Sequence, residues 1–459
     1  RISKVIVGGL PAEDSTFKLA INTESISGSG QFFGDVVTTD FRYPLREGLP
    51  LSLALKTNDW DFTRLFALFS GASKEGAFQT QMTSDLKIES LNGKFIDAKA
   101  DMIVQDFFIR RGSVEMKSEG AMKLSYQNRR FTTENWVIRG KDSFLELKSP
   151  ASTPQGLDLE LNGRVDLSLV SLATPFLDDL RGDLSLALKL AGKVDDPNIL
   201  GSAYVQNALV RFQDFPHAIQ DLNSDILFSQ KTILLNAIKG RMGGGALTGS
   251  GTVRLEGIKK VNINIGGRLE NAELNIPHGF ITRGSGDVSL TGEWFPYTLK
   301  TNYEVTGGQV SQNLSATGSG QPLTIQPSSF LPKFLLQENF EPIELDLNVT
   351  LRNELPVELK LGGLDINTPI TGKIRVNGTP SQPKLKGSLA TGVDGKVAFR
   401  SNQFEIRTGQ INYNDTRPEA PNVLVTAESR VDNYDIKLLV QGTGTQPEIT
   451  LSSQPPLAE

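Results

Sequence analysis

The 459-residue chain contains no cysteine and only two histidines. Without cysteine, neither a disulfide framework nor a thiolate metal site can form. His217 and His278 each follow a proline and lie far apart in sequence, without the spacing of a zinc site. We therefore expect both histidines to lie in loops, and we expect neither a metal nor a cofactor.

Clustered charge and long apolar runs are missing as well. The 47 Lys and Arg residues stand against 52 Asp and Glu residues, and no basic cluster is interleaved with aromatic residues. Because nucleic-acid binding needs a basic footprint, no nucleic acid is expected as a partner. No apolar run approaches the roughly 18 to 20 residues of a membrane-spanning helix. Since the chain opens at Arg1 instead of Met, we interpret it as a piece of a longer protein, so the missing membrane span says nothing about the parent protein.

The sequence also lacks the motifs that carry catalysis. The glycine-rich stretches at Gly28–Gly30, Gly243–Gly245 and Gly249–Gly251 lead into strand patterns, whereas phosphate-binding loops lead into helices, so we predict tight turns there. No Gly-x-Ser-x-Gly elbow stands between a strand and a helix. The acid pairs Asp178–Asp179 and Asp195–Asp196 are predicted at turns or helix ends. We therefore expect that the protein is not an enzyme, and we predict no catalytic residue.

What the sequence does contain is period-two alternation of apolar and polar residues. Leu345, Leu347, Val349 and Leu351 alternate with polar residues, as do apolar residues in many other runs. Such alternation predicts strands with one apolar and one polar face. At about ten to twelve residues per strand and turn, the chain would hold roughly 35 to 45 strands, most of them half-buried.

The breaks between these runs carry glycine, asparagine and proline. A glycine followed five residues later by proline occurs at Gly192, Gly378 and Gly442. We predict that the glycine ends one strand by adopting a positive φ and that the proline opens the next strand. Further turns are predicted at Asn92–Gly93, Asn162–Gly163 and Gly362–Gly363.

Three segments have helical spacing instead. They are Phe62 to Phe69 with Gly71 as the stop, Leu169 to Leu180, and Ser328 to Leu336. Short helices in an otherwise all-β chain are predicted to plug or cap the sheet.

The apolar strand faces need somewhere to be buried. One closed core rarely stays contiguous beyond about 250 to 300 residues, so a long curved sheet whose apolar face lines a groove fits this chain better than a single sandwich. An ordinary dry core remains the alternative for each position. The candidate groove residues are Leu345, Leu347, Val349, Ile374, Val376, Val397, Phe399, Phe404, Ile406, Ile411, Tyr413, Ile436, Leu438 and Val440.

Several stretches of the chain resemble the TamB family of bacterial envelope proteins, within the wider AsmA-like group. Upstream, Asp225 to Gly251 and Gly286 to Val310 resemble the repeated AsmA-like units. The C-terminal resemblance rests on Phe330 to Leu347 (FLPKFLLQENFEPIELDL), Thr371 to Gly387 (TGKIRVNGTPSQPKLKG), Phe404 to Tyr413 (FEIRTGQINY) and Tyr434 to Leu457 (YDIKLLVQGTGTQPEITLSSQPPL).

This resemblance implies an all-β fold, an elongated β-taco or β-solenoid-like curved sheet with a hydrophobic groove and a few short helices. It divides the chain into an AsmA-like repetitive region, residues 1–310, and a continuous C-terminal domain, residues 311–459. The implied protein spans the periplasm of a Gram-negative-type bacterium, anchored in the inner membrane and meeting both membranes through parts missing here. It has no catalytic residues.

The implied function is passage of phospholipid between the two membranes, with acyl chains in the groove and an outer-membrane barrel protein of the Omp85 type, similar to TamA, as partner. A charge at Leu347 or Leu438 would then block lipid transfer in a folded protein. Two other hypotheses stay open. One is a chaperone or scaffold for assembly of outer-membrane β-barrel proteins, whose unfolded strands would be held by the apolar groove or by a sheet edge. The other is a surface adhesin or structural β solenoid with a dry interior.

Overall fold

The structure of the protein is a computed structural model, and it is almost entirely strand. It describes residues 6–7, 10–11, 15–63, 78–150, 156–174, 177–193, 196–212, 215–256, 260–276, 280–313, 341, 343–361, 364–380, 382–400, 402–418, 420–443 and 446–456. Within these residues there are 30 strands, and 28 of them belong to one sheet. The predicted all-β fold built on one long sheet is confirmed.

The chain divides into two compact units, each described by itself. Unit 1 comprises residues 1–213, 221–236 and 328–338, and unit 2 comprises residues 214–220, 237–327 and 339–459. The sequence-based division between residues 310 and 311 stays a prediction.

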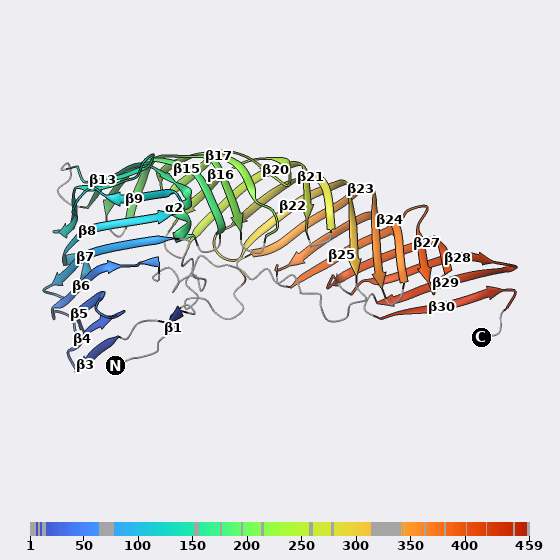
Figure 1. The fold of residues 1–459 in the computed structure, drawn as a ribbon, viewed down its shortest axis with the longest axis horizontal. Helices are drawn as coiled ribbons and strands as arrows, with labels where there is room; N and C mark the ends of the chain where they lie inside the picture. The colour runs from blue at the N-terminus through green and yellow to red at the C-terminus, as the bar shows by residue number, and fades with distance from the viewer. Residues whose placement is uncertain are drawn as a thin grey trace. The chain divides into compact units, whose positions relative to one another are not determined.

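Unit 1 carries the strands drawn from blue to green in Figure 1. Successive strands from β3 to β9 pair in antiparallel fashion, as expected for a meander of hairpins. The strands are β1 (Ile6–Val7), β2 (Leu10–Pro11), β3 (Thr16–Ile21), β4 (Ser25–Phe32), β5 (Val37–Pro44), β6 (Leu51–Trp60), β7 (Gln79–Ser90), β8 (Lys99–Arg111), β9 (Val114–Ser118), β10 (Met122–Gln127), β11 (Arg130–Glu134), β12 (Trp136–Arg139), β13 (Phe144–Lys148), β14 (Leu157–Asp166), β15 (Leu177–Lys193) and β16 (Asp196–Phe212).

Unit 2 carries the strands drawn from yellow-green to red in Figure 1. The boundary between the units falls within β17 (Ile219–Gln230) and β18 (Thr232–Met242). The further strands are β19 (Gly245–Leu255), β20 (Val261–Asn275), β21 (Phe280–Gly292), β22 (Tyr297–Asn313), β23 (Ile343–Leu361), β24 (Leu364–Gly378), β25 (Pro383–Thr391), β26 (Lys396–Phe399), β27 (Asn402–Thr416), β28 (Asn422–Val431), β29 (Tyr434–Thr443) and β30 (Gln446–Gln454).

Several of the described strands are longer than the sequence predicts, because some glycines do not end a strand. Gly28–Gly30 lies inside β4, Asn162–Gly163 inside β14, and Gly249–Gly251 inside β19, so the turns predicted there are wrong. Glycine is tolerated inside a strand where a neighbouring backbone approaches closely. The turns predicted at Asn92–Gly93 and Gly243–Gly244 are confirmed, and Gly362–Gly363 lies outside the described residues.

The glycine–proline corner at Gly378 forms as predicted. Gly378 is the last residue of β24, has a φ of +92°, and lies directly opposite Pro383, the first residue of β25. The same pairing across a hairpin joins Gly192 to Pro197 and Gly442 to Pro447. Gly192 and Gly442 have the predicted positive φ, but each stands one residue before the end of its strand, and Pro197 and Pro447 are each the second residue of the next strand. Because proline has no N–H to give to a ladder, it is found where a strand starts or at the edge of a sheet.

The pair formed by β22 and β23 differs from the antiparallel pairs described above. β22 and β23 run parallel, with Tyr297 opposite Ile343 and Tyr303 opposite Val349. Parallel neighbours cannot be joined by a tight turn and need a long crossover connection. Period-two alternation carries no information on strand direction, so the sequence pattern does not predict this pair.

Of the three predicted helices, the middle one lies within the described residues except at positions 175 and 176. Helix α2 (Leu167–Val170) continues as the 3₁₀ turn η2 (Ser171–Ala173), and Asp166 caps it by accepting a hydrogen bond from the Ser168 N–H at 2.7 Å. The prediction is wrong at its end, where Leu177–Leu180 are strand, because a residue before proline, here Thr174, disfavours the helical conformation.

The other two predicted helices lie mostly or wholly outside the described residues, at 64–77 and 328–336. The Asp61 side chain accepts the Thr63 N–H at 3.0 Å, as a capping residue does. A single 3₁₀ turn, η1 (Phe95–Asp97), lies between β7 and β8.

The remaining local predictions have mixed outcomes. His217 lies in the loop between β16 and β17 as predicted, whereas His278 and Asp195 lie outside the described residues. The prediction for Asp178–Asp179 is wrong, because both belong to β15 and Asp179 is largely buried beside Arg111.

Candidate functional site

All fourteen candidate residues lie in unit 2, and strand register puts them on one face of the sheet. Val349 lies opposite Ile374, Ile374 opposite Gly387, and Gly387 opposite Tyr413. Residues directly opposite each other in neighbouring strands share a face, so these four form a row across β23, β24, β25 and β27. This row is one transverse line of the apolar face.

A second row runs beside the first. Leu347 lies opposite Val376, which lies opposite Leu385. On β27, Ile411 lies opposite Leu389 of β25. Because side chains two residues apart point to the same side of a strand, both rows belong to one apolar face.

The same face continues toward β20, where no candidate residue was predicted. Leu345 is paired with Leu299 of β22, Leu299 with Leu290 of β21, and Leu290 with Ile265 of β20. The parallel β22–β23 pair preserves the face, since partners in its register are also side by side. The apolar face therefore crosses strand after strand without interruption.

Burial along this face is uneven, and the C-terminal part is closed. Among the candidates Val397, Phe404, Leu438 and Val440 are at most 2% exposed, and Ile406 is buried with them. They pack with buried Leu364, Val425 and Ala427, which were not predicted although they follow the same alternation. We call these eight residues the C-terminal cluster, and it is a dry core.

The other nine candidates are half-buried. Phe399 and Ile436 pack at the margin of the C-terminal cluster, and Val349 packs against a second buried cluster that includes Tyr303, Val305 and Leu355. The half-buried set is Leu345, Leu347, Val349, Ile374, Val376, Phe399, Ile411, Tyr413 and Ile436. These side chains keep part of their apolar surface uncovered and could take up an apolar ligand.

Tyr303 shows how a polar group is accommodated on the apolar face. Its hydroxyl donates a hydrogen bond to the Ala272 carbonyl oxygen at 3.1 Å, and burial raises its pKa. The phenol is therefore neutral near neutral pH, and this position adds no charge to the face.

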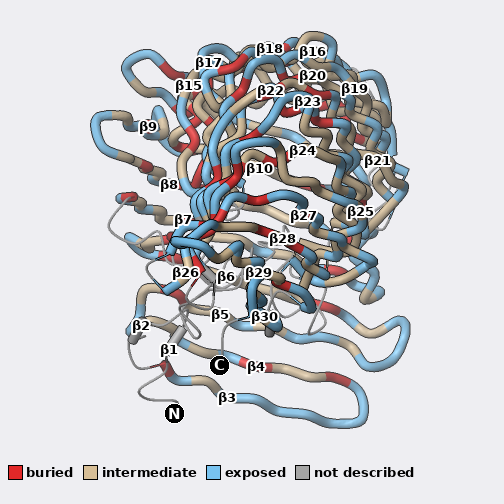
Figure 2. The backbone as a smooth tube through the Cα atoms, turned by 90° about the vertical axis from the view of Figure 1, so that its right-hand side faces the viewer, coloured by how far each residue is buried: buried red, intermediate tan, exposed pale blue. Residues whose placement is uncertain are grey.

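The reverse face is polar and crossed by ion pairs. Arg375 Nε lies 2.8 Å from the Asp346 carboxylate, and Arg407 Nε lies 3.1 Å from Glu428. Hydrogen bonds from Arg407 and then Lys437 hold the pKa of Glu428 below its usual value. In β27, buried Phe404 and Ile406 alternate with exposed neighbours, and in β28, buried Val425 and Ala427 alternate with exposed or half-buried ones. Figure 2 colours the backbone by this burial. Only one face is therefore suited to an apolar ligand.

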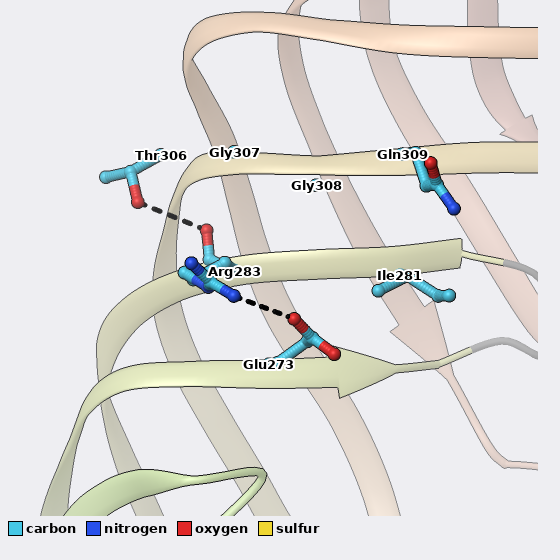
Figure 3. Close-up of a pocket in the computed structure, with 7 residues that line it drawn as sticks. All are labelled: Glu273, Ile281, Arg283, Thr306, Gly307, Gly308 and Gln309. Carbon is cyan, nitrogen blue, oxygen red and sulfur yellow. Dashed lines mark hydrogen bonds and ion pairs between the residues drawn. The ribbon is translucent and has the colours of Figure 1, made fainter.

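A pocket of about 500 Å³ lies among the ends of β20, β21 and β22. Figure 3 shows Glu273 and Arg283 beside it, joined by an ion pair of 3.0 Å, and Thr306 donating to the Arg283 carbonyl oxygen. Leu274, next to Glu273, instead packs in the buried cluster around Tyr303. Because neighbours along a strand point to opposite faces, the pocket belongs to the polar face and does not extend the apolar one.

Within the described part of the chain, no group of three or more His, Asp or Glu side chains is arranged to hold a metal ion. No helix in that part combines the length and apolarity needed to cross a membrane.

Comparison with known families identifies one domain. The family model of the TamB C-terminal domain matches residues 235–459, a range that contains all fourteen candidate residues. No curated protein matches the sequence.

Proposed function

Since residues 235–459 are a TamB C-terminal domain and the chain thus belongs to the TamB family, we propose that it carries phospholipid along the apolar face of its sheet. The family consists of envelope proteins that act in outer-membrane assembly and transport across the periplasm. In our proposal the acyl chains lie against the half-buried candidate residues, and the headgroup stays at the solvated margin.

The observation that carries this proposal is the unbroken register of apolar residues on one face. From Ile265 to Tyr413 each strand contributes apolar or glycine positions to the same side, while the other side carries ion pairs. A surface for one static ligand would need only a few strands. A face that repeats over successive strands suits a ligand that moves along it.

The energetics favour such a path. Two acyl chains with about 30 methylenes in total would cost on the order of 24 kcal/mol if they were exposed to water. A continuous apolar face removes most of this barrier without a chemical step, which agrees with a role that needs no catalytic residue.

We also propose the partners and place of action that the family resemblance implies. The protein would act in the periplasm, be held in the inner membrane by an N-terminal segment outside this chain, and meet an Omp85-type barrel protein at the outer membrane.

The rival role is that of a chaperone for outer-membrane proteins during assembly. Such a client would add a strand to a sheet edge by backbone hydrogen bonds, so it would engage β30 or β3 and leave the middle of the apolar face uncovered. In the described residues, each of these two strands pairs on one side only. A probe in the middle of the face separates the two roles.

The test is photo-crosslinking from position 347 in living cells, with position 348 as control. Leu347 is half-buried on the apolar face, and Asn348 is exposed on the polar face. Phospholipid adducts at 347 and none at 348 are expected. Absence of phospholipid adducts at 347, or lipid in equal amounts at both positions, would contradict the proposal.

Matched substitutions give the functional counterpart. Leu347→Asp is expected to lower co-purified phospholipid several-fold, because a carboxylate on the apolar face repels acyl chains. Asn348→Asp should leave the lipid content unchanged. Leu438→Asp is unsuitable for this test, since Leu438 is 1% exposed in the C-terminal cluster and an unpaired buried carboxylate would unfold that region.

A further inference from the structure

Helix α2 and η2 occupy the apolar face of unit 1. Leu169 and Leu172 are each 5% exposed and belong to one buried cluster with Ile109 and Met116 of the sheet. Ile109 and Met116 lie directly opposite each other in β8 and β9, so both point to the side on which the helix rests. The chain itself therefore covers the surface that a ligand would need.

The cluster beneath the helix extends along the sheet. Val104 of β8 and Met122 of β10 are directly paired, and both are at most 2% exposed. Phe62 and Phe78, at the ends of the segment that links β6 to β7, belong to the same cluster. An acyl chain could follow this face only if the helix were displaced.

A single arginine holds the helical segment by polar contacts. Arg111 Nη1 donates to the Ser171 Oγ at 2.8 Å and to the Ser168 carbonyl oxygen at 3.3 Å. Its Nη2 lies 3.2 Å from the Asp179 carboxylate, and its guanidinium lies 5.4 Å from the centre of the Phe78 ring. The side chains of Arg111 and Asp179 are only 22% and 15% exposed.

This polar attachment differs from ordinary core packing. Apolar residues of similar volume would hold a permanent cap at least as well, because a largely buried ion pair must first lose its hydration. Hydrogen bonds from a charged donor are stronger and more specific in geometry than neutral ones, so losing the Asp179 carboxylate would weaken the hold of Arg111 on the helical segment. The arrangement has the properties of a latch.

We propose that the segment from Leu167 to Ala173 is a plug in the lipid path of unit 1, latched by Arg111 and Asp179, and that lipid passes only when the latch opens. This inference rests on the proposed function of the apolar face. It adds a control point that the family assignment does not supply.

A thiol-accessibility experiment tests the plug without any lipid. Because the chain has no cysteine, Leu172→Cys introduces a single thiol on the side of the plug that packs against the sheet. Ser113→Cys instead introduces a single exposed thiol in the β8–β9 turn. Maleimide should modify position 172 much more slowly than position 113. Equal rates at the two positions would overturn the proposal.

The latch is tested by adding Asp179→Asn to the Leu172→Cys variant. The rate of modification is expected to rise roughly tenfold or more, as expected for the loss of a charge-assisted hydrogen bond. Asp183→Asn, in the same strand, removes the exposed Arg164–Asp183 pair and should leave the rate unchanged. Arg111→Lys, which keeps the charge but loses the planar fork, is a second latch variant. Unchanged rates in both latch variants would overturn the latch.

Photo-crosslinking then connects the plug to lipid. With the probe at position 116, which is 4% exposed beneath the plug, phospholipid adducts should be rare in the native protein and several-fold more frequent with Asp179→Asn. Abundant adducts at 116 without the latch variant would overturn the plug. Absence of lipid at position 347 in every variant would instead refute the proposed function, and the thiol rates would still decide the plug.

Discussion

Two leucines show how far burial differs among residues of the same type. Leu364 is fully buried in the C-terminal cluster, whereas Leu424 is 49% exposed on β28. Leu364→Ala is expected to lower the free energy of unfolding of this region by about 2–5 kcal/mol, because it leaves a cavity. Leu424→Ala should change it by less than about 0.5 kcal/mol.

Urea unfolding followed by hydrogen exchange of peptides from β24 to β29 measures both variants. If the two variants lowered stability equally, the C-terminal cluster would not be the dry core described above.

Sequence alternation predicts on which face of the sheet a side chain lies better than it predicts how deeply that side chain is buried. Leu347 and Leu438 look alike in their runs, yet one is half-buried and the other is 1% exposed. The difference arises because the β26–β27 hairpin brings Val397 and Phe404 together with Leu438, and such a contact depends on residues distant in sequence. The pattern therefore identified a set of side chains but could not separate the closed part from the half-buried part.

At the scale of elements, the loop before β17 is joined to the end of β20 by a hydrogen bond whose acceptor, His217, can be protonated. The Asn275 N–H at the end of β20 donates to Nε2 of His217 at 2.8 Å. Burial lowers the pKa of His217, and Glu273 opposes this effect more weakly. Only the neutral imidazole can accept this hydrogen bond.

This contact predicts a pH dependence with a definite sign. The pKa of His217 in the folded protein lies below its unfolded value of about 6.5. The stability contributed by this hydrogen bond is therefore fully present above about pH 6.5 and is lost as the pH falls through the folded pKa. Hydrogen exchange of the Asn275 amide, corrected for intrinsic rates, should therefore accelerate at acidic pH. His217→Gln supplies an acceptor that does not titrate, and its amide protection should stay constant. The same acid response in both proteins would rule out His217 as the cause.

Elements that depend on the backbone preferences of a few adjacent residues were predictable from the sequence. Elements that depend on pairing or packing between distant residues were not. The corner from Gly378 to Pro383 follows from the backbone preferences of two residues, and it formed as expected. The parallel pairing of β22 with β23 and the position of α2 over β8 and β9 depend on contacts far apart in sequence. The presence of a helix near residue 169 was predictable, but its role as a cover over Ile109 and Met116 was not.

At the scale of the whole molecule, the charged face should contribute little to stability. The Arg352–Glu304 pair is typical, with its side chains 61% and 48% exposed. Pairs this exposed add at most about 1 kcal/mol each and are screened by salt. Raising ionic strength from about 0.05 M to about 1 M should therefore not lower the thermal midpoint. A fall of several degrees, measured by circular dichroism, would show that the ion pairs hold the sheet together.

The fold class was predictable because one rule repeats along the whole chain. Alternation, glycine–proline corners and the scarcity of charge on one face agree from β19 to β30, and the resemblance to the TamB family covers the same region. The division of the contacts into two units is not visible in the sequence, because no change in composition marks it.

The order of strand pairing has a mechanical consequence. Among the described residues, each strand from β3 to β7 and from β28 to β30 is hydrogen-bonded only to its neighbours in sequence. Tension between the ends of such a run would open its hairpins one after another. β24 is bonded to both β25 and β26, and both are bonded to β27. These four strands must separate together, so they form a stiffer link than the runs of sequential hairpins on either side of them.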